Sequence, residues 1–257
     1  MRVFAVPDLP EFERGDSIAA AIEDRTEIRD GDVVCVASTV VSKVEGRTAS
    51  LEDFDSGPRA EAIAERLGRI HDDTVDPRFV QAVLEGSEDL LTEAPFVLTR
   101  TPVGHVGVNA GVDRSNTGGT DLLLLPTAPM ESAERIRAAF DADPAVIVTD
   151  TSGRPFRTGQ RGVAIGWAGI PATRDWRGET DRDGHELEVT VEAVVDELAA
   201  AANLVTGEGD DGLPVAVIRD FTFGAHDSTD RLFRREASDY VRAALEEWEY
   251  EANGVSE

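Results

Sequence analysis

Lysine is almost absent from this sequence. Lys43 is the only lysine in 257 residues, and arginine supplies the other fixed positive charges. Lysine is ordinarily a common exposed residue, so a chain that uses it once is expected to keep it for chemistry. Lys43 follows an apolar segment and a few hydroxyl residues, where its ammonium can serve as a compact point charge for a phosphate. The alternative is an ordinary surface lysine.

Positive charge of any kind is scarce. The sequence has 25 Lys and Arg against 51 Asp and Glu, a formal net charge of -26. Nucleic acids and anionic membranes need a basic surface, so both are excluded as major partners. Because 41% of the residues are hydrophobic and follow periodic patterns, we expect a folded chain. Such acidity indicates adaptation to high salt, where the Debye length falls to about 3 Å at 1 M.

Cysteine occurs only once, and long apolar runs are absent. With Cys35 alone no intramolecular disulfide can form, and its apolar surroundings favour a small core residue over a nucleophile. No apolar run approaches the length of a membrane span, and the N-terminal segment reaches Pro7 and Asp8 too early for a signal peptide. We therefore expect a cytoplasmic protein. Its length suits one large domain over residues 1–257 or two interleaved ones, with a frayed tail at 252–257.

Hydrophobic periodicity predicts a mixture of helices and strands. Helices are predicted around residues 18–22 after an Asp16 cap, at 58–70, at 77–84 after an Asp76 cap, at 131–140, at 189–205, and at 228–249 after an Asp227 cap. Strands are predicted at 33–37, 96–100, 105–109, 122–125, 145–149, 163–167 and 215–219. Because these elements do not alternate strictly, the sequence favours an α/β or mixed α+β fold over a simple doubly wound sheet.

Two predicted loops each place an aspartate after an apolar strand. Residues 111–116 read Gly-Val-Asp-Arg-Ser-Asn, and residues 149–157 read Thr-Asp-Thr-Ser-Gly-Arg-Pro-Phe-Arg. Asp113 and Asp150 can hold one magnesium or manganese ion between them, because magnesium takes one or two carboxylates and completes its shell with water and phosphates. The alternative for the first loop is an Asx turn in which Asp113 and Asn116 satisfy local backbone groups.

The second loop offers further ligands. The Thr151 hydroxyl can add an oxygen to a second ion. Arg154 and Arg157 can bind a carboxylate or a phosphate through two hydrogen bonds each, or they can pair with some of the many acidic side chains.

Residues 207–212 match the G-x-G-x-x-G pattern of dinucleotide-binding proteins, but in the wrong context. The true fingerprint follows a strand and opens a helix, whereas this stretch follows a predicted helix and precedes a strand. We therefore exclude a Rossmann site, and the missing G-x-x-x-x-G-K-[ST] pattern excludes a P-loop. The acidic turn can accept hydrogen bonds from guanine ring N–H groups or ribose hydroxyls, or it can be an ordinary helix cap and loop.

Five segments, in the same order, resemble the coenzyme F420-0:L-glutamate ligase family. They are Leu9-Pro10-Glu11-Phe12, Ser38-Thr39 with Lys43, residues 109–116, residues 150–157 and residues 196–212. The resemblance covers nearly the whole chain, and the sequence is similar to haloarchaeal members. Its most specific parts are the two aspartate loops and the spacing from Ser38-Thr39 to Lys43. It implies a family-specific mixed α/β ligase fold with two interleaved subdomains.

The resemblance implies GTP-dependent γ-glutamyl ligation. Family members phosphorylate the terminal carboxylate of F420-0 with GTP, and the amine of L-glutamate then attacks the acyl phosphate, which releases GDP and phosphate. A second glutamate can follow through a γ-glutamyl link. Members are homodimers that use two divalent cations, Mg²⁺ or Mn²⁺, and a monovalent cation, usually K⁺. The alternatives for this chain are a metal-dependent GTP phosphohydrolase and a non-catalytic nucleotide- or deazaflavin-binding module.

The resemblance also assigns roles to residues by position. The residues that would contact GTP are Leu9, Pro10, Glu11, Phe12, Ser38, Thr39, Lys43, Asn116, Thr206, Gly207, Glu208, Gly209, Asp210, Asp211, Gly212 and Leu213. Asp113 and Asp150 would hold the first metal and Thr151 would contribute to the second, with Lys43, Asp113 and Asp150 as the catalytic set. The chain departs from the family where Thr206 replaces a bulkier apolar residue, often methionine, and where Asp210-Asp211 makes the turn unusually acidic.

Overall fold

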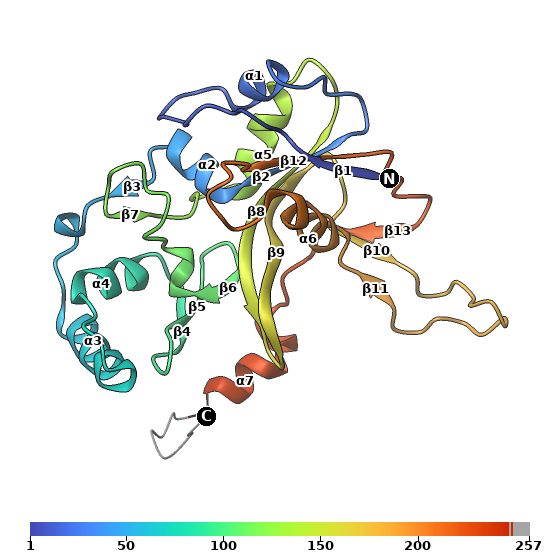
Figure 1. The fold of residues 1–257 in the computed structure, drawn as a ribbon. Helices are drawn as coiled ribbons and strands as arrows, with labels where there is room; N and C mark the ends of the chain where they lie inside the picture. Colours follow the sequence, from blue (N-terminus) through green and yellow to red (C-terminus); the bar gives the residue numbers. More distant parts are fainter. Residues whose placement is uncertain (247, 249–257) are drawn as a thin grey trace. The chain divides into compact units, whose positions relative to one another are not determined.

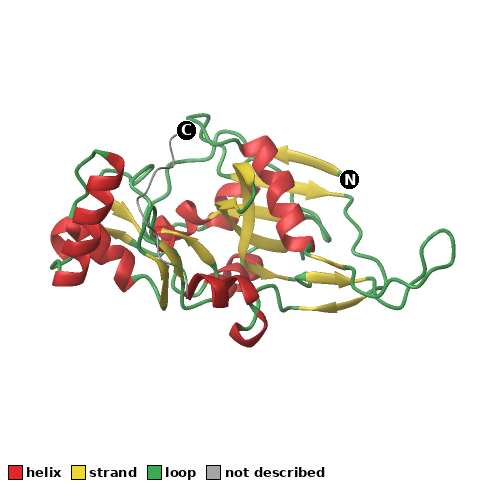
Figure 2. Ribbon diagram, turned by 90° about the horizontal axis from the view of Figure 1, so that it is seen from below, coloured by secondary structure: helices red, strands yellow, loops and turns green. Residues whose placement is uncertain are grey.

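The computed structural model describes residues 1–246 and 248 (Figure 1). The fold is a mixture of helices and several sheets (Figure 2), which confirms the predicted class. The chain divides into two compact units: residues 1–46 with 126–232 form unit 1, and residues 47–125 with 233–246 belong to unit 2. No helix in the described part of the chain is long and apolar enough to cross a membrane.

Unit 1 is built on a five-stranded sheet in the order β1-β12-β2-β8-β9. Its strands are β1 (Arg2–Ala5), β12 (Val215–Arg219), β2 (Val33–Ala37), β8 (Ala145–Arg154) and β9 (Arg157–Ala168). β2 and β8 run parallel, and the other neighbouring pairs run antiparallel. The apolar residues of β2 and β12 are almost fully buried, as expected for central strands that are covered on both faces.

Helices pack closely on this sheet. The α-helices of unit 1 are α1 (Ile18–Glu23), α2 (Ser38–Val44), α5 (Pro129–Ala138) and α6 (Val194–Thr206). Two glycines of β9 allow α5 and α6 to approach: a Cβ atom on Gly162 would lie 2.4 Å from the carbonyl oxygen of Ala199, and one on Gly166 would lie 2.3 Å from the backbone of Pro129. A small sheet completes the unit, with β10 (Thr173–Asp175) between β11 (Val191–Glu192) and β13 (Asp227–Thr229).

Unit 2 has its own apolar core. The elements of unit 2 are β3 (Thr48–Ala49), η1 (Leu51–Asp53), α3 (Pro58–His71), α4 (Pro77–Glu85), β4 (Asp89–Thr92), β5 (Leu98–Arg100), β6 (Val106–Val108), η2 (Asn109–Gly111), β7 (Leu122–Leu123), η3 (Glu236–Ser238) and α7 (Tyr240–Glu246), where η marks a 3-10 helix. β4, β5 and β6 form one sheet, and β3 pairs with β7. Ile63, Val80, Val83 and Leu122 are fully buried in this core.

Most predicted elements are present with shifted ends. The helices predicted at 58–70, 77–84 and 131–140 correspond to α3, α4 and α5. Asp76 caps α4 as predicted, because it accepts a hydrogen bond from the backbone N–H of Arg78 at 2.9 Å. The predicted Asp16 cap of α1 is wrong: Ser17 is the N-cap and accepts from the N–H of Ala20.

Two predicted helices begin too early. The helix predicted at 189–205 starts only at Val194, because residues 191–192 pair with β10 as strand β11. The helix predicted at 228–249 is wrong in its first half: residues 227–229 form β13, which also pairs with β10, and α7 begins at Tyr240. Residues 247 and 249 of that prediction, and the predicted tail at 252–257, lie outside the described residues.

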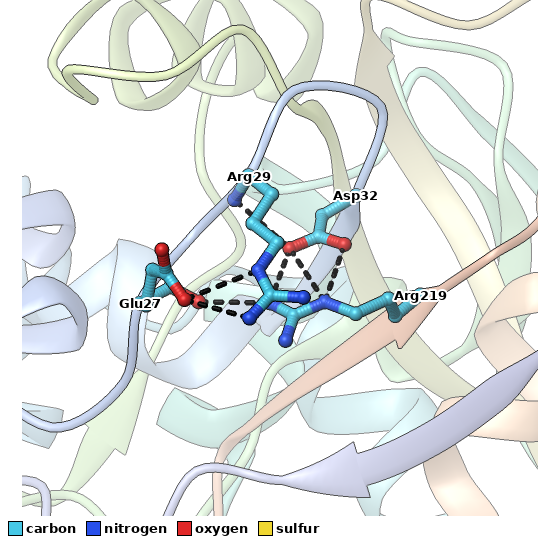
Figure 3. A network of polar contacts seen from close by, with 4 residues as sticks. All are labelled: Glu27, Arg29, Asp32 and Arg219. Carbon is cyan, nitrogen blue, oxygen red and sulfur yellow. Dashed lines mark hydrogen bonds and ion pairs between the residues drawn. The ribbon is translucent and has the colours of Figure 1, made fainter.

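A buried ion pair joins β2 to β12 at one end of the unit 1 sheet. The Asp32 side chain is 3% exposed and accepts hydrogen bonds from Arg219 Nε at 2.9 Å and Nη2 at 2.6 Å (Figure 3). Arg219 also donates to the carbonyl oxygen of Glu27 at 2.8 Å, and Asp32 accepts from the backbone N–H of Arg29 at 3.0 Å. The loop that leads into β2 is therefore fixed to the end of β12.

Replacing Asp32 with asparagine should destabilise the protein strongly. The substitution leaves the Arg219 guanidinium without a charged partner in a buried position, which costs about 3 kcal/mol or more of unfolding free energy. Denaturant unfolding at constant high salt measures the change. The matched control is Glu27→Gln, which neutralises a carboxylate whose side chain is 73% exposed and should leave stability nearly unchanged. Equal effects of the two substitutions would contradict the assignment.

Candidate functional site

The parallel pairing of β2 with β8 brings two predicted site segments together. Ala37 is the register partner of Thr149. The residues that come next after them, Ser38 and Asp150, therefore lie side by side. The buried Ser38 Oγ donates a hydrogen bond to Asp150 Oδ1 at 3.4 Å. The predicted loop around Asp150 is wrong in detail. Asp150 lies inside β8, opposite Val163 of β9, because β8 and β9 continue as a long hairpin beyond the apolar core (Figure 1).

Ser38, Thr39 and Lys43 lie on α2, a short helix that starts directly at the end of β2. The sequence did not predict this helix, because its β-branched residues are typical of strands. Burial of Val40 and Val41 stabilises it, an example of tertiary packing overriding local propensity. Thr39 and Lys43 are four residues apart and so share one face of the helix.

Lys43 is not an ordinary surface lysine. Its side chain is only 13% exposed, and its ammonium forms an ion pair with the carboxylate of Glu11, which is 72% exposed. This contact brings the predicted segment 9–12 against the last turn of α2. Phe12 in the same segment is buried. The structure therefore joins two of the segments that were predicted to contact GTP.

The glycine-rich turn meets β8 in the same unit. It follows α6 and precedes β12, as predicted, with Gly207 at φ 70° ending the helix. Thr151 Oγ1 donates a hydrogen bond to Glu208 Oε1 at 3.0 Å. Thr206 belongs to the helix, since its hydroxyl donates to the carbonyl oxygen of Ala202 at 3.3 Å. Residues 207–212 are exposed, so their backbone and carboxylates are open to a ligand.

Asp150 and Thr151 face opposite sides of the β8–β9 hairpin. Successive side chains of a strand alternate between faces, and register partners share one. Gly162, the register partner of Thr151, faces α6, because its added Cβ atom would touch that helix. Thr151 therefore lies on the α6 side and Asp150 on the other. Their side chains are not placed to serve one ion, and their assignment to two separate metals stays a prediction.

Asp113 and Asn116 belong to unit 2, whereas the other predicted site residues belong to unit 1. Asp113 pairs with Leu123 in an isolated bridge. Its Oδ1 accepts from the N–H of Ser115 at 2.7 Å and its Oδ2 from the Ser115 hydroxyl at 2.8 Å. The Asx turn that the sequence offered as an alternative is therefore present at Asp113. Sharing of one ion between Asp113 and Asp150 stays a prediction, as does the GTP contact of Asn116.

Among the remaining candidates, the two arginines are exposed and the cysteine is buried. Arg154 and Arg157 are register partners on either side of the hairpin tip, where both are exposed beside the fully exposed Phe156. Cys35 is buried in β2, and burial raises the pKa of its thiol to about 12. Its burial confirms Cys35 as a core residue, and the raised pKa keeps its thiol protonated at neutral pH.

Residues 8–220 match the family model described as F420-0:Gamma-glutamyl ligase. The chain belongs to the F420-0:gamma-glutamyl ligase family. A Halobacterium salinarum protein named coenzyme F420:L-glutamate ligase is 64% identical over 251 residues, which cover 98% of this chain and 99% of the relative. Proteins of the same name from Natronomonas pharaonis and Archaeoglobus fulgidus are 62% identical over 253 residues and 45% identical over 249 residues, covering 98% and 95% of this chain and 99% and 98% of the relatives.

Membership in the F420-0:gamma-glutamyl ligase family confirms the resemblance found in the sequence. The matched region contains all five of the segments that carried it. The protein is therefore a ligase that forms a carbon–nitrogen bond. The relatives from Halobacterium salinarum and Natronomonas pharaonis also fit the expectation of a salt-adapted protein.

The candidate ligands for a divalent cation in this ligase are side-chain oxygen atoms. The described residues contain no group of three His, Cys, Asp or Glu side chains that could bind a metal. They do offer the oxygen pairs Ser38 with Asp150 and Thr151 with Glu208. Magnesium is commonly held by one or two carboxylates, with waters and substrate phosphates completing its shell. The residues present therefore fit a divalent ion that arrives with a phosphate.

Replacing Lys43 with arginine should impair turnover by about 10-fold or more, the scale of a lost charge-assisted hydrogen bond. The planar guanidinium keeps the charge but does not fit a confined site for a point charge. Steady-state kinetics of ligation measures the effect. The matched control is Arg135→Lys on α5, where the side chain is 58% exposed and activity should persist. Full activity of Lys43→Arg would return Lys43 to a structural role beside Glu11.

Proposed function

We propose that this protein joins L-glutamate to coenzyme F420-0. GTP phosphorylates the terminal carboxylate of F420-0, and the amine of L-glutamate attacks the resulting acyl phosphate, which releases phosphate; GDP is the other product. A further γ-linked glutamate can follow. The proposal extends to this chain the activity in the names of its relatives. The structural observation that supports it most is the β2–β8 pairing, which gathers Ser38, Asp150 and the helix that carries Lys43 in one unit.

The chemistry explains why such a site is needed. A carboxylate is a poor electrophile, and phosphorylation converts one of its oxygens into a leaving group. The enzyme must bring two anions together and neutralise charge while the phosphoryl group moves. In a chain of net charge -26, contact ions have to do this, because the distant carboxylates are screened in high salt.

The proposed roles follow the positions of the side chains. Lys43 binds a phosphate of GTP as a point charge, and Ser38 and Thr39 at the start of α2 contact the nucleotide as well. Asp150 binds a first Mg²⁺ or Mn²⁺ with Asp113, and Thr151 contributes to a second. When bound, these ions neutralise the transferred phosphoryl group. K⁺ is the proposed monovalent cofactor, and the active form is proposed to be a homodimer.

The base and ribose of GTP are assigned to acidic groups. Guanine N–H groups and ribose hydroxyls are hydrogen-bond donors, and the segment 9–12 and the turn 207–213 supply carboxylate and carbonyl acceptors. Thr206 and Asn116 complete the proposed contacts. Arg154 and Arg157 at the hairpin tip are proposed to bind a carboxylate or phosphate of F420-0 or glutamate.

The test is a ligation assay in high salt with GTP, Mg²⁺ or Mn²⁺, F420-0 and L-glutamate. The expected products are GDP and an F420 species heavier by one glutamyl unit, detected by mass spectrometry. Phosphate release that needs neither F420-0 nor glutamate would indicate a GTP phosphohydrolase instead. Tight nucleotide or deazaflavin binding without turnover would indicate a binding module.

Replacing Asp150 with asparagine should lower kcat/KM for ligation by about 100-fold or more, the scale for loss of one electrostatic contact in the transition state. The matched control is Asp183→Asn, which neutralises an exposed carboxylate in the turn at 181–184 and should retain activity. Unchanged ligation by Asp150→Asn would remove the metal role from this residue.

A further inference from the structure

Arg161 is an arginine of β9 whose charge has no partner among the residues that the structure describes. It is partly buried, and its Nε atom is buried without a hydrogen-bond partner. None of the described residues forms an ion pair with it. This is unexpected in a sequence with 51 acidic residues, where other partly buried arginines such as Arg174 and Arg219 form two or more hydrogen bonds to a carboxylate.

The register of the hairpin places Arg161 on the same face as Asp150. Arg161 pairs with Ser152, and Asp150 pairs with Val163. Gly162 between them faces α6, so Arg161 and its register partner Ser152 face the other side, where Ser38 contacts Asp150. Diagonal neighbours across an antiparallel pair lie about 7–8 Å apart, within reach of a long side chain.

A buried guanidinium Nε–H with no acceptor among the described residues is suited to bind an anion. Nearly all buried polar groups in folded proteins have a hydrogen-bond partner. A group without one indicates a ligand or a water molecule that completes the site. Five N–H donors in a planar fork match the oxygens of a phosphate or a carboxylate. The neighbouring Asp150 carboxylate does not repel such an anion if a divalent cation lies between them, as the proposed function requires.

We propose that Arg161 is a substrate-binding residue that contacts an oxyanion, phosphoryl or carboxylate, on the Asp150 face of the β8–β9 hairpin. This inference rests on the proposed ligase function. It adds a fixed positive charge that approaches the reacting groups from β9, whereas Lys43 approaches from α2. The two cations and the metal would then surround an anion whose charge is redistributed during phosphoryl transfer.

The first experiment separates binding from folding. The variant is Arg161→Met, which keeps much of the aliphatic length, and the control is Arg182→Gln, which removes an exposed guanidinium from the turn at 181–184. Without ligands, Arg161→Met should melt no lower than the wild-type protein, because removal of an unpaired, partly buried charge is not destabilising. With GTP and Mg²⁺, a smaller rise in melting temperature than in the control supports a phosphoryl contact.

The second experiment identifies the anion. In the ligation assay, kcat/KM of Arg161→Met should fall about 10- to 100-fold, the scale of a lost hydrogen bond to a charged group, and Arg161→Lys should recover part of the loss. A raised KM for GTP, or a lowered kcat alone, assigns the contact to the phosphoryl group. A raised KM for F420-0 or L-glutamate assigns it to a carboxylate.

Failure of this inference is distinct from failure of the proposed function. If the wild-type protein ligates glutamate and Arg161→Met matches the Arg182→Gln control in every constant, the role of Arg161 is overturned and the ligase stands. A lower melting temperature without ligand, with kinetics that follow the folded fraction, would also overturn it in favour of a structural role. If the wild-type protein forms no amide product, the proposed function fails first.

Discussion

The parallel ladder between β2 and β8 is the constraint on which the unit 1 site depends. β2 ends at Ala37 and turns directly into α2, whereas β8 continues past its partner Thr149. The backbone hydrogen bonds of this ladder set where Ser38 and Asp150 stand, and a slip of one residue would turn the affected side chains to the other face. The ion pair between Asp32 and Arg219 joins the opposite end of β2 to β12, so β2 is held at both ends.

Electrostatics in this protein is decided by contacts rather than by the overall field. The net charge of -26 would repel an anionic ligand at low salt, and screening removes that repulsion only beyond about one Debye length. Two positive side chains of the site, Lys43 and Arg161, have defined positions in the fold. Lys43 is partly buried against Glu11, and Arg161 lies within a sheet. Neither is one of many interchangeable surface charges.

The sequence was sufficient where a periodic apolar pattern coincides with the element. It predicted β2, α3, α4 and β12 because their apolar residues form the cores of the two units. It failed where backbone pairing extends past the core, as in the polar half of the β8–β9 hairpin, and where packing overrides propensity, as in α2. The candidate site residues were predicted from the order of five sequence segments. Their contacts with one another, such as Thr151 with Glu208, depend on strand register, which no short stretch of sequence specifies.

The short helix α2 has a consequence for how this site can change. A helix advances about 100° per residue, and α2 starts where β2 ends, with no intervening loop to absorb a change in length. An inserted or deleted residue between Thr39 and Lys43 would rotate the ammonium about the helix axis, away from Glu11 and from Thr39 on the same face. The number of residues between Thr39 and Lys43 is therefore fixed by the helix geometry. For this reason the spacing of these residues indicates the site better than the composition of the segment does.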